Sequence, residues 1–137
     1  MPMREAIIPG AWPERMTFSP AVRVGNLLFI SGTTATDESR QIVGVGDIVA
    51  QTRQIFRKFE AILAAAGASF DNIVETTDYY LTLEDYDKTA AVRREFLRPP
   101  YPAATGVQVA GLIRPDALIE IKAIAVLDAV RSERAGR

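Results

Sequence analysis

The chain has 137 residues, and its 16 lysines and arginines nearly balance its 17 aspartates and glutamates, giving a net charge of −1. This length fits one domain, and the balanced charge gives no broad field to attract nucleic acid or an anionic membrane, so neither is expected as a partner. With no cysteine and no histidine, disulfides, thiol nucleophiles, histidine-dependent triads and zinc sites built on these residues are excluded. Any catalysis must use carboxylates, hydroxyls, arginine, lysine or backbone amides.

We expect no secretory or membrane-spanning segment in this sequence. Residues 1–12 lack a long apolar segment, and no apolar run approaches the roughly 20 residues needed to cross a bilayer. We therefore expect a cytoplasmic protein. The charged residues 129–137 lack apolar spacing and are predicted to be a frayed tail on a single domain, 1–137, whose core spans about 18–126.

The first predicted elements are the strands of a hairpin. A Gly-Asn turn separates an apolar segment at Ala21–Val24 from a second at Leu27–Ser31. This pattern of two short apolar runs around a turn dipeptide is typical of antiparallel strands.

A long helix is predicted next, over Ile48–Ala66. Apolar residues recur there at helical spacing, while the charged residues, Lys58 among them, fall largely on the other side. Asp47 offers an N-cap oxygen, and Gly67 is placed to end the helix.

The rest of the chain adds a strand, a shorter helix and two more strands. Residues 72–82 are β-branched and aromatic, which favours a strand. Residues 84–97 predict a helix that stops at the prolines following it. Residues 103–110 and 117–127 predict the last two strands. The order β-β-α-β-α-β-β indicates an α+β sandwich with its helices on one face of a sheet.

Two helices leave the second face of such a sheet uncovered. That face is expected to carry Leu118, Ile124, Tyr80 and either Leu27 or Leu28. Because an exposed apolar sheet face is usually covered by another copy of the chain, we expect a homo-oligomer.

Glu120 is the first candidate for chemistry, because it interrupts an otherwise apolar strand. A carboxylate on a partly covered face has a raised pKa, which suits a general base. The alternative is a structural ion pair, either with Lys122, two residues along on the same face, or with a basic group across a subunit interface, and spacing alone favours a structural pair. Asp78, inside another predicted strand, is either a site residue or a satisfied interface group, and the structural role is again favoured.

Three arginines are candidates for holding a carboxylate by paired hydrogen bonds. Arg93 and Arg94 lie on the second helix, and Arg114 lies in the loop before the last strand. The simpler interpretation, a solvated helix face and loop, is favoured.

Several of these segments together resemble one family. The segments FSPAVRVGNLLFISG, ILAAAGASFDNIVETTDYYLTLEDY, YPAATGVQVAGL and IEIKAIAV are similar to the Rid family, the reactive intermediate deaminases that hydrolyse enamines and imines. The similarity runs from about Phe18 to Val126. It implies a chorismate-mutase-like α+β fold, assembled as a homotrimer with small-molecule clefts between subunits, and no metal or organic cofactor.

The resemblance also assigns site residues. In the deaminases the strand after the proline reads Pro-Ala-Arg-Ser/Thr, and its arginine clamps the carboxylate of an imino acid, whereas Ala104 stands at that position here. Glu120 matches a glutamate that positions or activates the attacking water, and is the expected catalytic residue. The expected substrate-binding residues are Phe18, Gly32, Ala104, Thr105 and Gly106.

These assignments predict an imine or enamine deaminase that does not use the usual small 2-imino acids. Ala104, with Gly106 beside it and Phe18 opposite, predicts a roomier and less polar pocket, and hence a bulkier or less acidic substrate. The alternative is a non-catalytic trimer of the same fold that binds a small metabolite. Ribonuclease activity gains no support, because the chain lacks histidine and a basic groove.

Overall fold

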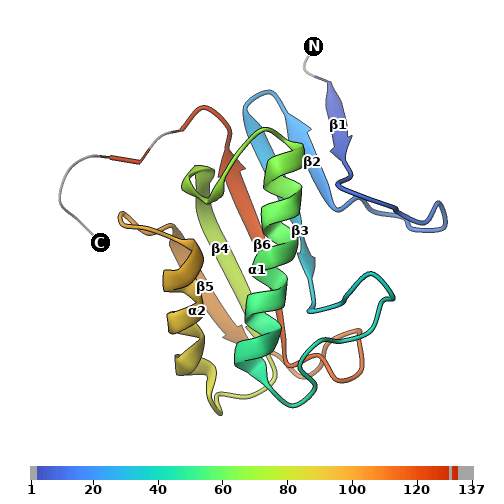
Figure 1. Ribbon diagram of the computed structural model, residues 1–137, viewed down its shortest axis with the longest axis vertical. Helices are drawn as coiled ribbons and strands as arrows, with labels where there is room; N and C mark the ends of the chain where they lie inside the picture. Colours follow the sequence, from blue (N-terminus) through green and yellow to red (C-terminus); the bar gives the residue numbers. More distant parts are fainter. Residues whose placement is uncertain (1–2, 130, 133–137) are drawn as a thin grey trace.

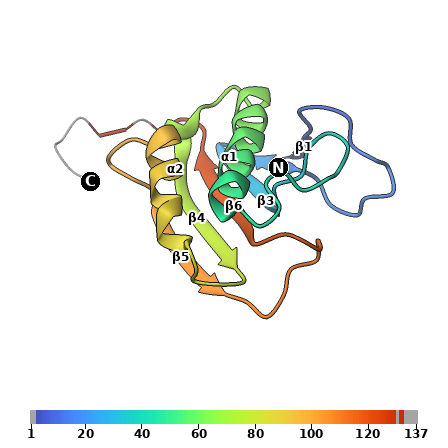
Figure 2. The ribbon, with the colours of Figure 1, turned by 60° about the horizontal axis from the view of Figure 1, so that its bottom comes forward.

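The computed structural model describes residues 3–129 and 131–132. In this part of the chain, six strands form one mixed sheet with two α-helices on one of its faces (Figures 1 and 2). The elements are β1 (Arg4–Ile7), β2 (Ala21–Val24), β3 (Leu27–Thr33), α1 (Ile48–Ala65), β4 (Ile73–Tyr80), α2 (Thr89–Phe96), β5 (Ala103–Gln108) and β6 (Ile119–Val126), with 3₁₀ turns η1 (Phe70–Asn72) and η2 (Tyr86–Lys88). This is the expected chorismate-mutase-like α+β fold.

The sheet order is β1-β2-β3-β6-β4-β5, and only β4 and β5 run parallel. The last strand of the chain, β6, therefore lies in the middle, between β3 and β4. This position places two candidate site residues that are far apart in the sequence on neighbouring strands, because β6 carries Glu120 and β3 carries Gly32.

The signals at the ends of α1 act as predicted. The Asp47 side chain accepts a hydrogen bond from the backbone N–H of Ala50 at 3.0 Å, satisfying one amide of the first turn. Gly67 follows the C-cap with a φ of +73°, a left-handed conformation that glycine adopts without steric cost.

Two elements differ from the prediction. Strand β1 was not predicted, because its first residues are exposed and polar and only Ile7 is buried, so it shows no clear alternation. The second helix was predicted from residue 84 but begins at Thr89. Asp85 adopts a left-handed conformation with a φ of +60°, and η2 separates it from the helix.

The core lies between α1 and the sheet. On β6 the predicted alternation is confirmed, with one face buried; its buried members are Ile119, Ile121, Ala123 and Ala125. These residues face α1, which contributes Ile55, Phe56 and Phe59, all without exposed surface. The fold thus fixes Glu120, which alternates with the buried residues, on the opposite face.

The opposite face of the sheet carries apolar side chains, as predicted, but not all of the predicted ones. Leu27 and Phe29 remain 37% and 43% exposed, and Phe29 is paired with Ile124 across β3 and β6. The prediction was wrong for Tyr80 and for the alternative Leu28, which are 8% and 0% exposed and belong to the core. Both alternate onto the helix-covered face.

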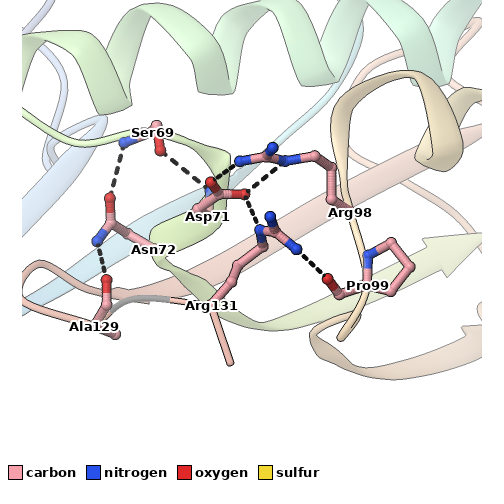
Figure 3. Close-up of polar contacts among 7 residues, drawn as sticks. All are labelled: Ser69, Asp71, Asn72, Arg98, Pro99, Ala129 and Arg131. Carbon is pink, nitrogen blue, oxygen red and sulfur yellow. Dashed lines mark hydrogen bonds and ion pairs between the residues drawn. The ribbon is translucent and has the colours of Figure 1, made fainter. Parts of the chain in front are cut away.

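The end of the described chain is held against η1 (Figure 3). The Asp71 carboxylate accepts from Arg98 and pairs with Arg131, whose Nη1 donates to the carbonyl oxygen of Pro99 at 2.5 Å. The Asn72 side chain donates to the carbonyl oxygen of Ala129 at 2.9 Å. Part of the tail predicted over 129–137 therefore makes defined contacts, while residues 130 and 133–137 lie outside the described residues. In the described ranges, no helix has both the length and the apolar character to span a bilayer.

Candidate functional site at the end of strands β3 and β6

The site begins with the close approach of Gly32 and Glu120. The pairing between β3 and β6 shifts register between Ile30 and Thr33, which places Gly32 at an irregularity in the sheet. A β-carbon on Gly32 would lie 2.5 Å from Oε2 of Glu120. Only glycine therefore leaves room for the carboxylate in its observed position.

The segment that follows Phe18 lies along the same end of β3. The Ser31 hydroxyl donates to the carbonyl oxygen of Ser19 at 2.6 Å, and the Ser31 N–H donates to that of Pro20 at 3.0 Å. Phe18 itself is 52% exposed and packs edge-on against Trp12, with ring centroids 5.3 Å apart. The two aromatic rings border a surface hollow of about 430 Å³.

A lysine that the sequence placed on the polar side of α1 belongs to this site. Lys58 Nζ donates to Thr33 Oγ1 at 2.5 Å, to the Thr34 carbonyl oxygen at 2.9 Å and to Thr36 Oγ1 at 2.7 Å. These three bonds use every donor of the ammonium group. Lys58 thus fixes the segment after Gly32 and is not free to hold a ligand directly.

Burial governs the electrostatics of this group. Burial raises the pKa of the Glu120 carboxyl above its ordinary value, and the charge of Lys58 opposes this shift. Burial also lowers the pKa of Lys58 to about 8, with Arg40 and then Arg114 adding to the shift and Glu120 opposing it. A half-buried carboxylate with a raised pKa has the properties of a general base.

The ion pair expected between Glu120 and Lys122 is not formed. No ion pair in the described residues includes Glu120, and Lys122 is exposed. The spacing argument for this pair was wrong because Lys58, which comes from a different element, supplies the opposing charge.

Ala104 and Gly106 lie on the other face of the sheet. On β4 the register pairs Ala104 with Thr76 and Gly106 with Asp78, both buried beneath the helices. Thr105 alternates onto the open face, where it pairs with Thr77. Since β4 separates β5 from β6, Ala104 and Glu120 differ in both face and strand, and one chain does not bring them together.

The space beside Gly106 is already occupied. A β-carbon there would lie 2.8 Å from the Tyr86 hydroxyl and 3.3 Å from Cε1 of Tyr80. The Tyr86 hydroxyl donates to Asp78 Oδ2 at 2.8 Å. The glycine therefore makes room for Tyr86 on the helix-covered face of the sheet.

Asp78 is a buried group on the helix-covered face. Burial raises the pKa of its carboxyl, while the bond from Tyr86 and the charge of Arg93 oppose the shift. Its Oδ1 has no hydrogen-bond partner among the described residues. Asp78 is thus separated from the site at Glu120 by the thickness of the sheet.

The three candidate arginines lie in different places. Arg93 is half-buried on α2 and close enough to act on Asp78, on the same side of the sheet as Ala104. Arg94 is exposed. Arg114 is half-buried and donates through Nη2 to the carbonyl oxygen of Arg40. The structure thus gathers Phe18, Gly32, Glu120, Lys58 and Arg114 toward one end of the sheet, and leaves Arg93 with Ala104 and Gly106.

Known proteins with similar sequences and structures cover nearly the whole chain. The family model described as endoribonuclease L-PSP matches residues 11–127. The chain is 36% identical to the 3-aminoacrylate deaminase RutC of Acinetobacter baylyi, over 89% of this chain and 97% of that protein. A Pseudomonas aeruginosa protein of unknown function has a similar structure, with a TM-score of 0.86, 31% identity and coverage of 98% and 100% of the two chains.

A further solved structure carries the name RidA. RidA from an Antarctic Psychrobacter species is 34% identical, with a TM-score of 0.77 and coverage of 88% of this chain and 94% of that one. Together with the family match, these similarities show that the chain belongs to the endoribonuclease L-PSP family, also known as the Rid family.

Proposed function

We propose that this protein hydrolyses the C=N bond of an imine, which it receives directly or as the enamine tautomer, and that Glu120 is its general base. The observation that carries the proposal is the half-buried Glu120 carboxylate above Gly32, with a raised pKa and no ion pair among the described residues. The deaminase name of the RutC relative supports this class of reaction.

The reaction needs little beyond a base and a polar pocket. An enamine first tautomerises to the imine. Water then adds to the C=N carbon while Glu120 accepts the proton that the water loses. The resulting carbinolamine takes a proton on nitrogen and collapses, releasing ammonia and leaving a carbonyl compound. Atoms balance as imine plus water giving carbonyl compound plus ammonia, with no oxidant or reductant.

The substrate is proposed to bind without a carboxylate clamp from β5. Ala104 provides no charge at the position where the family resemblance expects arginine, and its strand partner Thr76 is buried. A hydrogen bond to a charged group contributes about 1.5–3 kcal/mol. Its loss weakens binding of a small 2-imino acid by roughly tenfold or more, unless another cation replaces it.

The active assembly is proposed to be a homotrimer with its clefts between subunits, in the cytoplasm. Two features support an assembly. The open sheet face carries exposed Leu27 and Phe29, and the expected substrate-binding residues are divided between the two faces of one chain. A cleft built by two chains brings Ala104 of one subunit toward Glu120 of another.

The test is release of ammonia from reactive intermediates generated in situ. Candidates are 3-aminoacrylate, the substrate that names the RutC relative, together with 2-iminobutanoate and 2-iminopropanoate. The proposal expects catalysed release from at least one imine or enamine. It also expects the Ala104→Arg variant to gain activity on the two 2-imino acids. Equal activity of wild type and Ala104→Arg on 2-iminobutanoate would refute the argument from Ala104.

A further inference from the structure

Two arginines that form no ion pair among the described residues lie within electrostatic reach of Lys58, the lysine whose charge acts on Glu120. The charges of Arg40 and Arg114 lower the pKa of Lys58 and that of Glu120 opposes the shift, so each of these three groups lies within electrostatic reach of Lys58. No ion pair among the described residues involves Arg40 or Arg114. The group therefore carries an excess of positive charge next to the proposed base.

The two arginines come from loops that meet at one end of the sheet. Arg40 lies between β3 and α1, and Arg114 lies between β5 and β6 (Figure 1). The hydrogen bond from Arg114 Nη2 to the carbonyl oxygen of Arg40 joins the two loops. Because β3 ends at this point and β6 begins there, the joined loops border the end of the sheet that holds Gly32 and Glu120.

The acidic side chain nearest Arg40 in the described hydrogen-bond network is engaged by backbone amides. Asp37, in the same loop as Arg40, accepts from the backbone N–H groups of Ser39 and Gln41 at 2.9 and 3.0 Å. Arg114 Nε is enclosed and has no hydrogen-bond partner in the described part of the chain. A donor with no acceptor is unfavourable. A carboxylate bound at this guanidinium would supply an acceptor and a compensating negative charge.

We propose that Arg40 and Arg114 form an anion-binding subsite beside Glu120, and that it holds the carboxylate of the substrate. Identifying the bound carboxylate as part of a substrate rests on the proposed function. Binding of a carboxylate at the subsite does not depend on that function. The subsite takes a single carboxylate attached to the carbon skeleton that carries the C=N group. The two arginines bind that carboxylate from loops of the same subunit that supplies Glu120. They take the role that the family resemblance assigns to an arginine on β5.

Binding of a stable product analogue tests the subsite directly. The probes are 2-oxobutanoate, which has a carboxylate and a carbonyl group, and 2-butanone, which has only the carbonyl group. Their affinities are measured by NMR titration of the full-length protein. The variants are Arg40→Gly and Arg114→Gln, with Arg57→Gln as the matched control, because Arg57 is an exposed arginine on α1. Arg40→Gly suits the backbone, since Arg40 has a φ of +63°.

The expected result is binding of 2-oxobutanoate that weakens at least tenfold in Arg40→Gly and in Arg114→Gln. The control Arg57→Gln is expected to stay within twofold of wild type, and 2-butanone is expected to bind equally to all four proteins. Unchanged affinity in the folded Arg40→Gly variant, or no binding of 2-oxobutanoate by wild type, would overturn the subsite. If Arg114→Gln does not fold, Arg40→Gly decides alone.

The same experiment separates this inference from the proposed function. Binding that depends on both arginines, without ammonia release from any imine or enamine tested, supports the subsite and refutes the deaminase. Ammonia release whose KM is unaffected in Arg40→Gly and Arg114→Gln supports the deaminase and refutes the subsite.

Discussion

Gly32 and Glu120 share one small space between β3 and β6, because a β-carbon on the glycine would lie 2.5 Å from Oε2 of the carboxylate. The contact involves the far end of a flexible side chain, so a larger residue at position 32 displaces the carboxylate and leaves the backbone in place. The glycine thus sets the position of the proposed base.

Gly32→Ala is therefore expected to lower kcat/KM for ammonia release about tenfold to a hundredfold, since misplacing a catalytic group by about 1 Å has an effect of this order. Thermal unfolding is expected to change little, because Gly32 has no positive φ and Glu120 is free to move. Gly10→Ala is the matched control, with no heavy atom within 4 Å of the added β-carbon. Wild-type activity in Gly32→Ala would contradict this role.

Glu120→Gln is expected to stabilise the fold near neutral pH. Burial raises the pKa of Glu120 in the folded state above the ordinary 4.5, so its proton is bound more tightly in the folded than in the unfolded chain. The resulting stabilisation is present below about pH 4 and is lost as pH rises through the folded-state pKa. Glutamine does not titrate and avoids that loss.

The difference in melting temperature between Glu120→Gln and wild type is thus expected to be near zero at about pH 4 and positive at about pH 7. Because the carboxylate is only half-buried, the difference is small, on the order of a few degrees. Scans across this pH range measure it. A lower melting temperature for Glu120→Gln at neutral pH would instead indicate a stabilising ion pair.

Lys58 is expected to act as a positioning residue whose charge tunes Glu120. Its ammonium opposes the rise in the pKa of Glu120, so Lys58→Met raises that pKa further. The acid limb of the pH profile of kcat/KM then moves to higher pH. Arg57→Met, at an exposed neighbour on the same helix, is expected to leave the limb in place. A profile that falls in height without moving would assign Lys58 a structural role alone.

Gly106→Ala is expected to destabilise the fold by about 1–3 kcal/mol, because the new β-carbon would displace the Tyr86 hydroxyl and leave buried Asp78 without its donor. In a Tyr86→Phe background much of that cost is already present, so the same substitution costs less there. Urea unfolding of the two single variants and the double variant measures the coupling. Strictly additive costs would show that Gly106 and Tyr86 act independently.

The sequence predicted the elements well where periodicity was strong. Helix α1 and strand β6 carry long, regular patterns of apolar residues, and both matched the structure closely. Strand β1 was missed because its exposed Arg4 and Glu5 leave no alternation to detect. Tyr80 was assigned to the wrong face, since a strand pattern gives two alternating sets without stating which set the helices cover.

The site was harder to predict because it depends on contacts between distant residues. A helical pattern places Lys58 on the polar side of α1 but does not show that Thr33, Thr34 and Thr36 come within hydrogen-bonding distance of it. The bond between Arg114 and Arg40 joins residues 74 apart in sequence. Register, which no local pattern supplies, decides that Ala104 lies on the face opposite Glu120.

The most direct test of the central claim is the rate of ammonia release by wild type and Glu120→Gln on 3-aminoacrylate and 2-iminobutanoate. The account predicts catalysis by wild type on at least one of them, and a fall of roughly 10²–10⁴-fold in kcat/KM in a Glu120→Gln protein that remains folded. Equal rates in the two proteins would contradict it and return Glu120 to a structural role.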